Sequence, residues 1–147
     1  PYLRNSLWQL GYGADTVETC VPWSQATPLM RALERTAQDR YAVHGERLLA
    51  FTHLSHVYAQ GCSIYSTFVF PCAGDVDEDL ARWRDLKHAL SSVILAHGGT
   101  ISHQHGVGRD HLPYLPEEKG ALGMRMIRSA AEALDPGGQM NPGKLFA

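Results

Sequence analysis

The stretch Cys62-Ser63-Ile64-Tyr65-Ser66-Thr67-Phe68-Val69-Phe70 has the alternating pattern of a β-strand with one buried face. Ile64, Phe68 and Phe70 are apolar and stand two or four residues apart, so they share one side of an extended chain. The residues between them are more polar and include Tyr65. The pattern predicts a strand over residues 62–70 whose apolar side faces the core, with Tyr65 on the opposite, more polar side.

The residues before this strand predict its partner. Residues 47–54 form a second strand candidate, and residues 55–61 are predicted as the loop between the two strands. That loop carries His56 and Tyr58. Two strands joined by one connection pair most simply as antiparallel neighbours, so we expect an antiparallel hairpin with a long connection.

Two helices are predicted on either side of the hairpin. The first runs to about Tyr41 from Ser24 or Thr27, either of which can cap a helix. The second has apolar residues at helical spacing until the Gly98-Gly99 pair ends it. Residues 1–22 are mixed and predict only a short helix at their start.

A third helix is predicted near the C-terminus. It opens at Pro116 and ends before the Pro-Gly-Gly of residues 136–138. Its predicted buried stripe consists of Leu122, Met126, Ile127, Ala130 and Leu134. Helices that flank a hairpin, without strand–helix alternation, favour an α+β fold in which an antiparallel sheet is covered by helices.

The composition limits the classes of function. A chain of 147 residues, 44% hydrophobic and 19% charged, suits one globular domain. A net charge of −2 gives no electrostatic reason to expect nucleic acid or an anionic membrane as a partner, and no apolar run is long enough for a transmembrane segment.

Three cysteines without CxxC spacing predict free thiols in a reducing, cytoplasmic compartment. Since the N-terminus lacks an initiating methionine and an apolar signal core, we interpret the chain as a fragment or a processed product.

Residues 98–111, Gly-Gly-Thr-Ile-Ser-His-Gln-His-Gly-Val-Gly-Arg-Asp-His, predict a functional loop. Glycines at this density let the backbone turn sharply and approach other groups closely. In an extended segment His103 and His105 would point the same way. From the residues alone, three interpretations stay open: histidines bonded within a polar loop, metal ligation completed by His56 or His111, and acid–base chemistry.

Four motifs, in this order along the chain, resemble those of one enzyme family. They are residues 15–19 with 21–23, residues 53–58 with 61–65, the His-rich loop at 98–108, and residues 134–136 with 141–145. Together they are similar to the alkyldihydroxyacetonephosphate synthase branch of the FAD-linked oxidases, in the vanillyl-alcohol oxidase superfamily. The resemblance spans almost the whole chain.

The resemblance implies a division of the chain and a set of partners. Residues 1–134 would form the later part of a cap or substrate domain, and residues 135–147 a tail that returns to an FAD-binding domain absent from this chain. FAD is the implied cofactor, and the implied partners are a small-molecule substrate and that FAD-binding domain, with no nucleic acid and no transmembrane segment. Apolar surface left by the absent domain would favour self-association, as in a homodimer.

The resemblance also implies roles for residues that match the family's motifs, and the guanidinium of Arg109 could pair with a substrate phosphate or carboxylate. Proton transfer, substrate binding and contact with the cofactor are the roles concerned. The predicted catalytic residues are Tyr65, His103 and His105; the predicted substrate-binding residues are His56, Gln104 and Arg109; and the predicted cofactor contacts are Gly106 and Asn141.

Gln104 departs from the pattern of the family. The synthases have a third histidine at this position, and a neighbouring branch of hydroxy-acid dehydrogenases has a glutamate that helps to bind a divalent metal. The glutamine amide can donate and accept hydrogen bonds but carries no charge. We therefore predict no metal site.

The function implied is that of the C-terminal part of an FAD-dependent oxidoreductase, acting on a hydroxy acid or a related CH–OH substrate. The chain would contribute the substrate-side wall of the active site and would be inactive by itself. One alternative is the synthase reaction itself, a flavin-dependent alkyl transfer in ether-lipid synthesis. The other is a non-catalytic α+β binding or dimerisation module.

Overall fold

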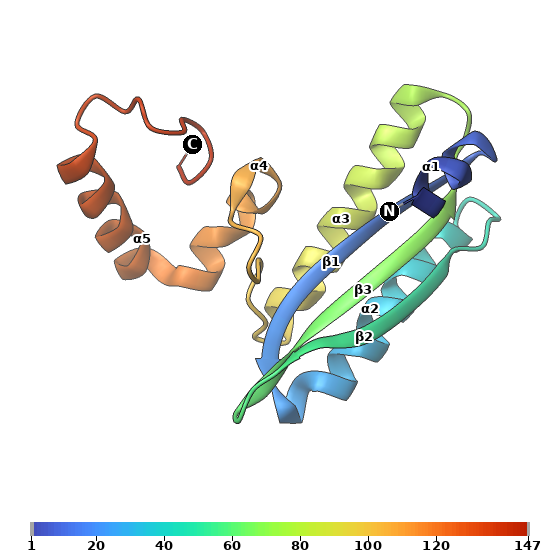
Figure 1. Ribbon diagram of the computed structural model, residues 1–147, viewed down its shortest axis with the longest axis horizontal. Coiled ribbons are helices and arrows are strands. Elements are labelled where there is room, and N and C mark those ends of the chain that lie inside the picture. Colours follow the sequence, from blue (N-terminus) through green and yellow to red (C-terminus); the bar gives the residue numbers. More distant parts are fainter. Residues whose placement is uncertain (1, 147) are drawn as a thin grey trace.

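The computed structural model describes residues 2–146 and has the predicted α+β architecture (Figure 1). One antiparallel sheet packs against two long helices, and a helical C-terminal part extends away from it. In chain order the elements are α1 (Tyr2–Gln9), β1 (Tyr12–Pro22), α2 (Trp23–Ala42), β2 (Leu49–Val57), β3 (Gly61–Pro71), α3 (Val76–Ala96), α4 (Gly108–His111), the 3-10 helix η1 (Leu112–Tyr114) and α5 (Leu115–Leu134).

Strand β3 is the centre of the sheet, whose strand order is β1-β3-β2. It contains the predicted strand over residues 62–70, and its antiparallel pairing with β2 confirms the predicted hairpin. The connection is shorter than predicted, because β2 continues through residues 55–57, which the sequence pattern assigns to the loop. The alternation fails there because the register shifts by one residue at Ser55.

Strand β1, for which the sequence pattern predicts no strand, pairs antiparallel with β3 along its whole length. Val17, Glu18 and Thr19 are all buried, although consecutive side chains of a strand point to opposite faces. The sequence of β1 therefore lacks the alternation of apolar and polar residues that identifies a strand with one buried face. Gly13 weakens the strand pattern further. A glycine is needed there, since a Cβ at this position would lie 2.4 Å from Cε2 of the Phe70 ring. Pairing with β3 therefore defines a strand that local sequence does not.

Helices α2 and α3 cover one face of the sheet and bury the core against it (Figure 1). The helical stripe of α2 is buried, as its spacing predicts, and so is the predicted core face of β3. Burying a large apolar side chain contributes roughly 1.5–3 kcal/mol to folding, so this face supplies most of the stability of the sheet. Its fully buried side chains include Leu29, Leu33, Ala37, Ile64, Phe68, Leu86 and Leu90.

The opposite face of the sheet, here called the open face, is covered by neither α2 nor α3 (Figure 1). Glu18 of β1 lies opposite Tyr65 of β3 in the register. Tyr65 alternates with the fully buried Ile64 and is only partly exposed itself. The predicted orientation of Tyr65, away from the core, is confirmed.

Helix α5 extends away from the sheet, and the prediction that its apolar stripe is buried is wrong (Figure 1). Leu122, Met126 and Leu134 are 63%, 66% and 84% exposed. Helical periodicity identifies an apolar face but not the surface that covers it, and α5 packs only near its start, where Leu115 is buried. None of the described helices combines the length and apolarity needed to span a membrane.

Candidate functional site

A β-bulge in β2 turns two adjacent side chains toward the open face. His53 lies opposite Tyr65 on this face, so regular alternation would place His56 on the covered face. The register shift makes Ser55 the extra residue and sets His56 opposite Ser63. The Ser63 hydroxyl oxygen lies 2.6 Å from Ser55 Oγ and 3.1 Å from His56 Nδ1. The bulge is thus what brings His56 to the open face.

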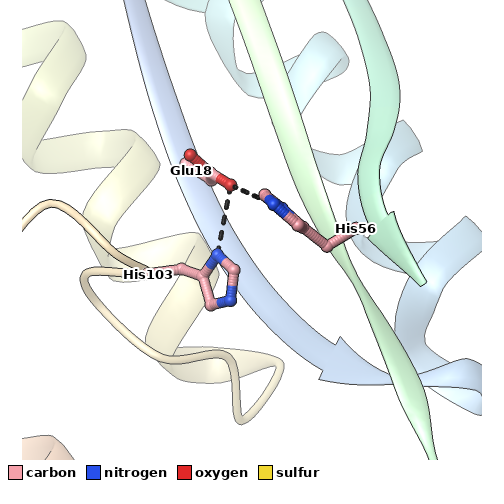
Figure 2. Close-up of side chains that lie close together, drawn as sticks. All are labelled: Glu18, His56 and His103. Carbon is pink, nitrogen blue, oxygen red and sulfur yellow. Dashed lines mark hydrogen bonds and ion pairs between the residues drawn. The ribbon is translucent and has the colours of Figure 1, made fainter. Parts of the chain in front are cut away.

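Glu18 of β1 lies at the centre of the site, with its side chain only 5% exposed. Its Oε1 atom lies 3.1 Å from His103 Nδ1 and 3.8 Å from His56 Nδ1 (Figure 2). Its Oε2 atom lies 3.3 Å from His105 Nε2, and the Ser55 hydroxyl donates a hydrogen bond to Oε1 at 2.9 Å. Imidazoles from β2 and from the His-rich loop therefore converge on one carboxylate of a third element.

The surroundings of Glu18 keep its carboxyl group ionised. Burial raises its pKa, but hydrogen bonds from His103 and Ser55 and the charges of His105 and His103 outweigh burial, so the pKa of Glu18 lies below its ordinary value. A carboxylate can only accept hydrogen bonds. Consequently, Nδ1 of His103, which is hydrogen-bonded to Glu18, carries the proton toward it.

Two hydrogen bonds join the start of the His-rich loop to β1. The Thr100 backbone N–H donates to the Cys20 carbonyl at 3.2 Å, and the Thr19 hydroxyl donates to the Thr100 carbonyl at 2.8 Å. A Cβ on Gly99 would lie 2.6 Å from Thr19 Oγ1, so this close approach requires glycine. On the other side, the Glu118 carboxylate accepts from the Ile101 backbone N–H at 2.7 Å.

The loop itself is bent rather than extended, which differs from the prediction. Gln104 has a φ of 62° and Gly106 a φ of 72°, both in the left-handed region. The Ser102 hydroxyl donates to the Gly106 carbonyl and closes the bend. His103 and His105 share one target, as predicted, but through a turn at Gln104 rather than through period-two alternation.

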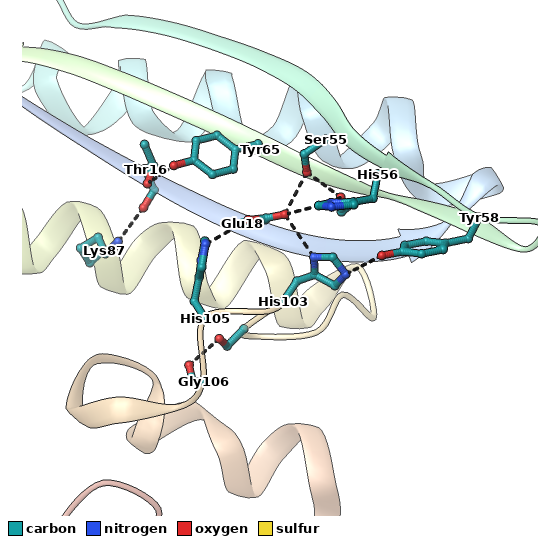
Figure 3. A network of polar contacts seen from close by, with 12 residues as sticks. Thr16, Glu18, Ser55, His56, Tyr58, Tyr65, Lys87, His103, His105 and Gly106 are labelled. Carbon is teal, nitrogen blue, oxygen red and sulfur yellow. Dashed lines mark hydrogen bonds and ion pairs between the residues drawn. The ribbon is translucent and has the colours of Figure 1, made fainter. Parts of the chain in front are cut away.

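Two tyrosines complete the polar network of the open face (Figure 3). The Tyr65 hydroxyl donates to Thr16 Oγ1 at 3.2 Å, and the ring centroid of Tyr65 lies 6.4 Å from that of His105. The Tyr58 hydroxyl lies 3.1 Å from His103 Nε2. The network therefore contains two phenols, each near a different imidazole.

The structure separates the eight predicted site residues into two groups. Those whose side chains reach the network around Glu18 are Tyr65, His56, His103 and His105. Those whose side chains are not part of it are Gln104 and Arg109, which are exposed, Gly106, which acts through its carbonyl, and Asn141, which lies in the tail beyond α5.

No role is predicted for Glu18, although it lies in the first family motif, residues 15–19. A charged residue between Val17 and Thr19 is the other available signal, and it has meaning only once residues 12–22 are recognised as a strand. Nor does local sequence place Tyr58, which follows the bulge, next to a loop 45 residues away.

The same cluster has the donor atoms of a metal site. One ligand atom each from Glu18, His56 and His103 lie within 4.8 Å of one another. Two imidazoles and a carboxylate are a donor set that zinc accepts. Gln104, whose lack of charge led to the prediction of no metal site, is not in this donor set, so the absence of a metal stays a prediction.

Comparison with known proteins places this geometry in a family context. The family model described as "FAD linked oxidases, C-terminal domain" matches residues 1–145. An alkyldihydroxyacetonephosphate synthase of Trypanosoma brucei brucei is 34% identical over 99% of this chain and 24% of its own length. A D-2-hydroxyglutarate dehydrogenase of Stutzerimonas stutzeri (strain A1501) is 24% identical over 97% of this chain and 31% of its own length.

A solved structure of an alkyldihydroxyacetonephosphate synthase is similar in fold. Its TM-score is 0.69 at 24% sequence identity, and the match covers 99% of this chain and 23% of that one. The match confirms the predicted α+β fold. The chain thus spans about a quarter of the length of its synthase relatives.

Proposed function

This chain belongs to the FAD-linked oxidases as their C-terminal domain, and from that premise we propose that it forms the substrate-side wall of a flavin-dependent active site. The observation that carries the proposal is the convergence of His56, His103 and His105 on the buried Glu18 carboxylate. Acid–base catalysis needs titratable groups held in place on a surface that a substrate can reach. The open face has such groups, and neither α2 nor α3 covers it.

The chemistry of the open face fits a position beside a flavin. Phenol, imidazole and hydroxyl groups on an uncovered sheet face suit a wall next to a planar ring and a polar substrate. Bound FAD supplies the acceptor for a hydride. We propose that the Gly106 backbone contacts it, and that most of FAD is held by an FAD-binding domain of a longer parent protein, since the chain spans about a quarter of its synthase relatives.

The C-terminal part of the chain is proposed to join the two domains. The exposed apolar residues Leu122, Met126 and Leu134 of α5 would pack on the FAD-binding domain, and Asn141 would contact the cofactor from the tail. A homodimer is the other association that such a surface supports. The cysteines are free thiols, which favours a reducing, cytoplasmic compartment for the parent protein.

Each predicted residue has a proposed part in the reaction. His103 and His105 would exchange protons with the substrate, with their orientation fixed by Glu18, and Tyr65 would act on the same face. His56, Gln104 and Arg109 would bind polar groups of the substrate. In the reaction that we propose first, a hydroxy acid or related CH–OH compound is oxidised: its hydroxyl proton passes to an imidazole as a hydride leaves the carbon.

The second candidate is alkyl transfer of the synthase kind. The 34% identity to an alkyldihydroxyacetonephosphate synthase favours it, although Gln104 stands where the synthases have a third histidine. In this reaction the same imidazoles would move a proton at a carbon of a ketone phosphate. The geometry of the open face serves both reactions, so the substrate must distinguish them.

An absorption spectrum of the purified full-length parent protein tests the proposal. A flavin band bleached by a hydroxy acid would support the oxidoreductase, and a flavin that responds only to acyl-dihydroxyacetonephosphate would support the transferase. His103→Ala should lower turnover roughly 100-fold or more while the flavin stays bound. A parent protein without flavin would refute both reactions and leave a non-catalytic module.

A further inference from the structure

Among the tyrosines whose side chains the structure describes, Tyr58 is the one on the open face whose hydroxyl lies against an imidazole. It directly follows β2, and its backbone is fixed on both sides: its N–H donates to the Gly61 carbonyl at 2.8 Å, and its carbonyl accepts from Trp23 Nε1 at 3.1 Å. The side chain is 40% exposed, and its ring stacks on His56 with the centroids 6.3 Å apart. A phenol held in this way is positioned for a specific contact.

The contact is with the far nitrogen of His103. The Tyr58 hydroxyl lies 3.1 Å from Nε2, and Nδ1 lies 3.1 Å from Glu18 Oε1 on the other side of the ring (Figure 3). Because the Glu18 carboxylate only accepts, Nδ1 carries the hydrogen. In the neutral ring Nε2 then has the lone pair and accepts the phenol O–H. The Glu18 carboxylate, the His103 imidazole and the Tyr58 hydroxyl thus form one hydrogen-bonded series. The same order of groups activates a hydroxyl nucleophile in other enzymes, but here the hydroxyl belongs to a phenol.

We infer that Tyr58 relays the proton that His103 exchanges with the substrate during turnover, and that Glu18 is the positioning residue for the His103 ring. The inference rests on the proposed function, because it assigns the proton path within the same site. It is not the role given to Tyr65, whose hydroxyl donates to Thr16 Oγ1 rather than to an imidazole.

The proton path balances without any further reactant. A substrate proton passes to the Tyr58 oxygen while the phenol proton passes to Nε2 of His103. The ring becomes an imidazolium between the phenol and the Glu18 carboxylate, and the charge of Glu18 does not change. In the oxidation the reverse transfer releases the proton to solvent through the exposed edge of Tyr58, and in the alkyl transfer it returns the proton to the product.

The chain contains a matched pair outside the site. His88 of α3 and Tyr114 of η1 are joined by a hydrogen bond of 2.9 Å between Nδ1 and the phenol oxygen. Within residues 2–146, no ion pair joins His88 to a carboxylate, whereas His103 is paired with Glu18. Tyr114→Phe therefore removes a tyrosine–histidine hydrogen bond of the same kind without the carboxylate.

The test compares Tyr58→Phe with Tyr114→Phe in the full-length, flavin-loaded parent protein. Tyr58→Phe keeps the ring that stacks on His56, and a flavin spectrum and a melting curve check that the variant is folded. We expect Tyr58→Phe to lower kcat about 100-fold with KM changed less than threefold, and to remove one limb of the pH profile of kcat. Tyr114→Phe should leave kcat within twofold.

The outcomes separate this inference from the proposed function. If His103→Ala lowers turnover and Tyr58→Phe does not, the inference fails and the proposed function stands. If His103→Ala has no effect, the proposed function itself fails. Glu18→Gln should shift the pH profile of kcat, and an unshifted profile in the folded variant would contradict the role of Glu18.

A metal titration supplies an independent check. A metal ion on His103 Nδ1 would replace the proton that points at Glu18. If a chelator abolishes the activity of the purified parent and Zn²⁺ restores it, the proton path is overturned in favour of a metal centre. Activity that is indifferent to both reagents agrees with the path.

Discussion

The two faces of the sheet use the same strands for opposite purposes. On the face covered by α2 and α3, Ile64 and Phe68 are 0% and 1% exposed and pack in the core. On the open face, Tyr65 alternates with them along the same strand, and Glu18 lies opposite it. The covered face gains stability from apolar burial, whereas the open face holds polar groups together through hydrogen bonds and charge. Substitutions on the covered face should therefore lower the free energy of unfolding, whereas substitutions on the open face should mainly change the proposed chemistry.

The largest effect is expected when one side chain on each face of β3 is truncated to alanine and the losses in the free energy of unfolding are compared. Phe68→Ala leaves a cavity in the core, and we expect it to lower the free energy of unfolding by about 3–5 kcal/mol. Thr67→Ala, one residue away on the open face, should cost about 1 kcal/mol or less. Urea unfolding of the chain measures both, with Phe68→Leu as the milder variant if Phe68→Ala does not fold. Equal losses would contradict the assignment of the faces.

A smaller loss of stability is expected where Gly99 of the His-rich loop contacts Thr19 of β1. In Gly99→Ala the new Cβ would lie 2.6 Å from Thr19 Oγ1 and 3.0 Å from Ile94 Cγ2, so β1 and the His-rich loop must separate. We expect a loss of about 1–3 kcal/mol, as is typical of overpacking. Combining Gly99→Ala with Thr19→Ala removes the contacted hydroxyl. A double-mutant cycle that shows no coupling between the two would contradict this close approach.

The open face should also make stability depend on pH. Folding lowers the pKa of Glu18, so its stabilisation is complete above the pKa of the unfolded carboxyl, about 4.3, and is lost as the pH falls through the lower folded value. Comparing wild type with Glu18→Gln isolates this contribution, because Glu118 also has a lowered pKa and remains in both proteins. The difference in unfolding free energy should shrink between pH 6 and pH 3, roughly the range around that unfolded pKa. A constant difference would contradict it.

The smallest effect is expected on the outer surface of the covering helices. Arg40 of α2 and Asp85 of α3 form an ion pair of 3.4 Å with both side chains about half exposed. Arg40→Ala should change the free energy of unfolding by about 0.5 kcal/mol or less, since water and salt screen such pairs. Thermal unfolding at low and high salt is the measurement. A larger loss would mean that α2 and α3 depend on charge as well as on apolar burial.

Local sequence accounts for the covered face. The alternation of Ile64, Phe68 and Phe70 predicts β3, and the spacing of Leu29 and Leu33 predicts the buried side of α2. Both succeed because apolar burial against a single face imposes a period on the sequence. The same rule identifies α5 as amphipathic, but it does not say what covers the apolar side, and the predicted burial is wrong.

Tertiary structure alone decides the arrangement of the site. The family motifs name Tyr65, His103 and His105, but the carboxylate that joins the imidazoles, Glu18, belongs to a strand without a local signature. The bulge at Ser55 reverses the face on which His56 stands, and no periodicity predicts it. Buried positions recur at a regular spacing along a helix or a strand, so the spacing of apolar residues in the sequence predicts them. The convergence of β1, β2 and a distant loop on one carboxylate depends on pairing register and chain path, which exist only in the folded chain.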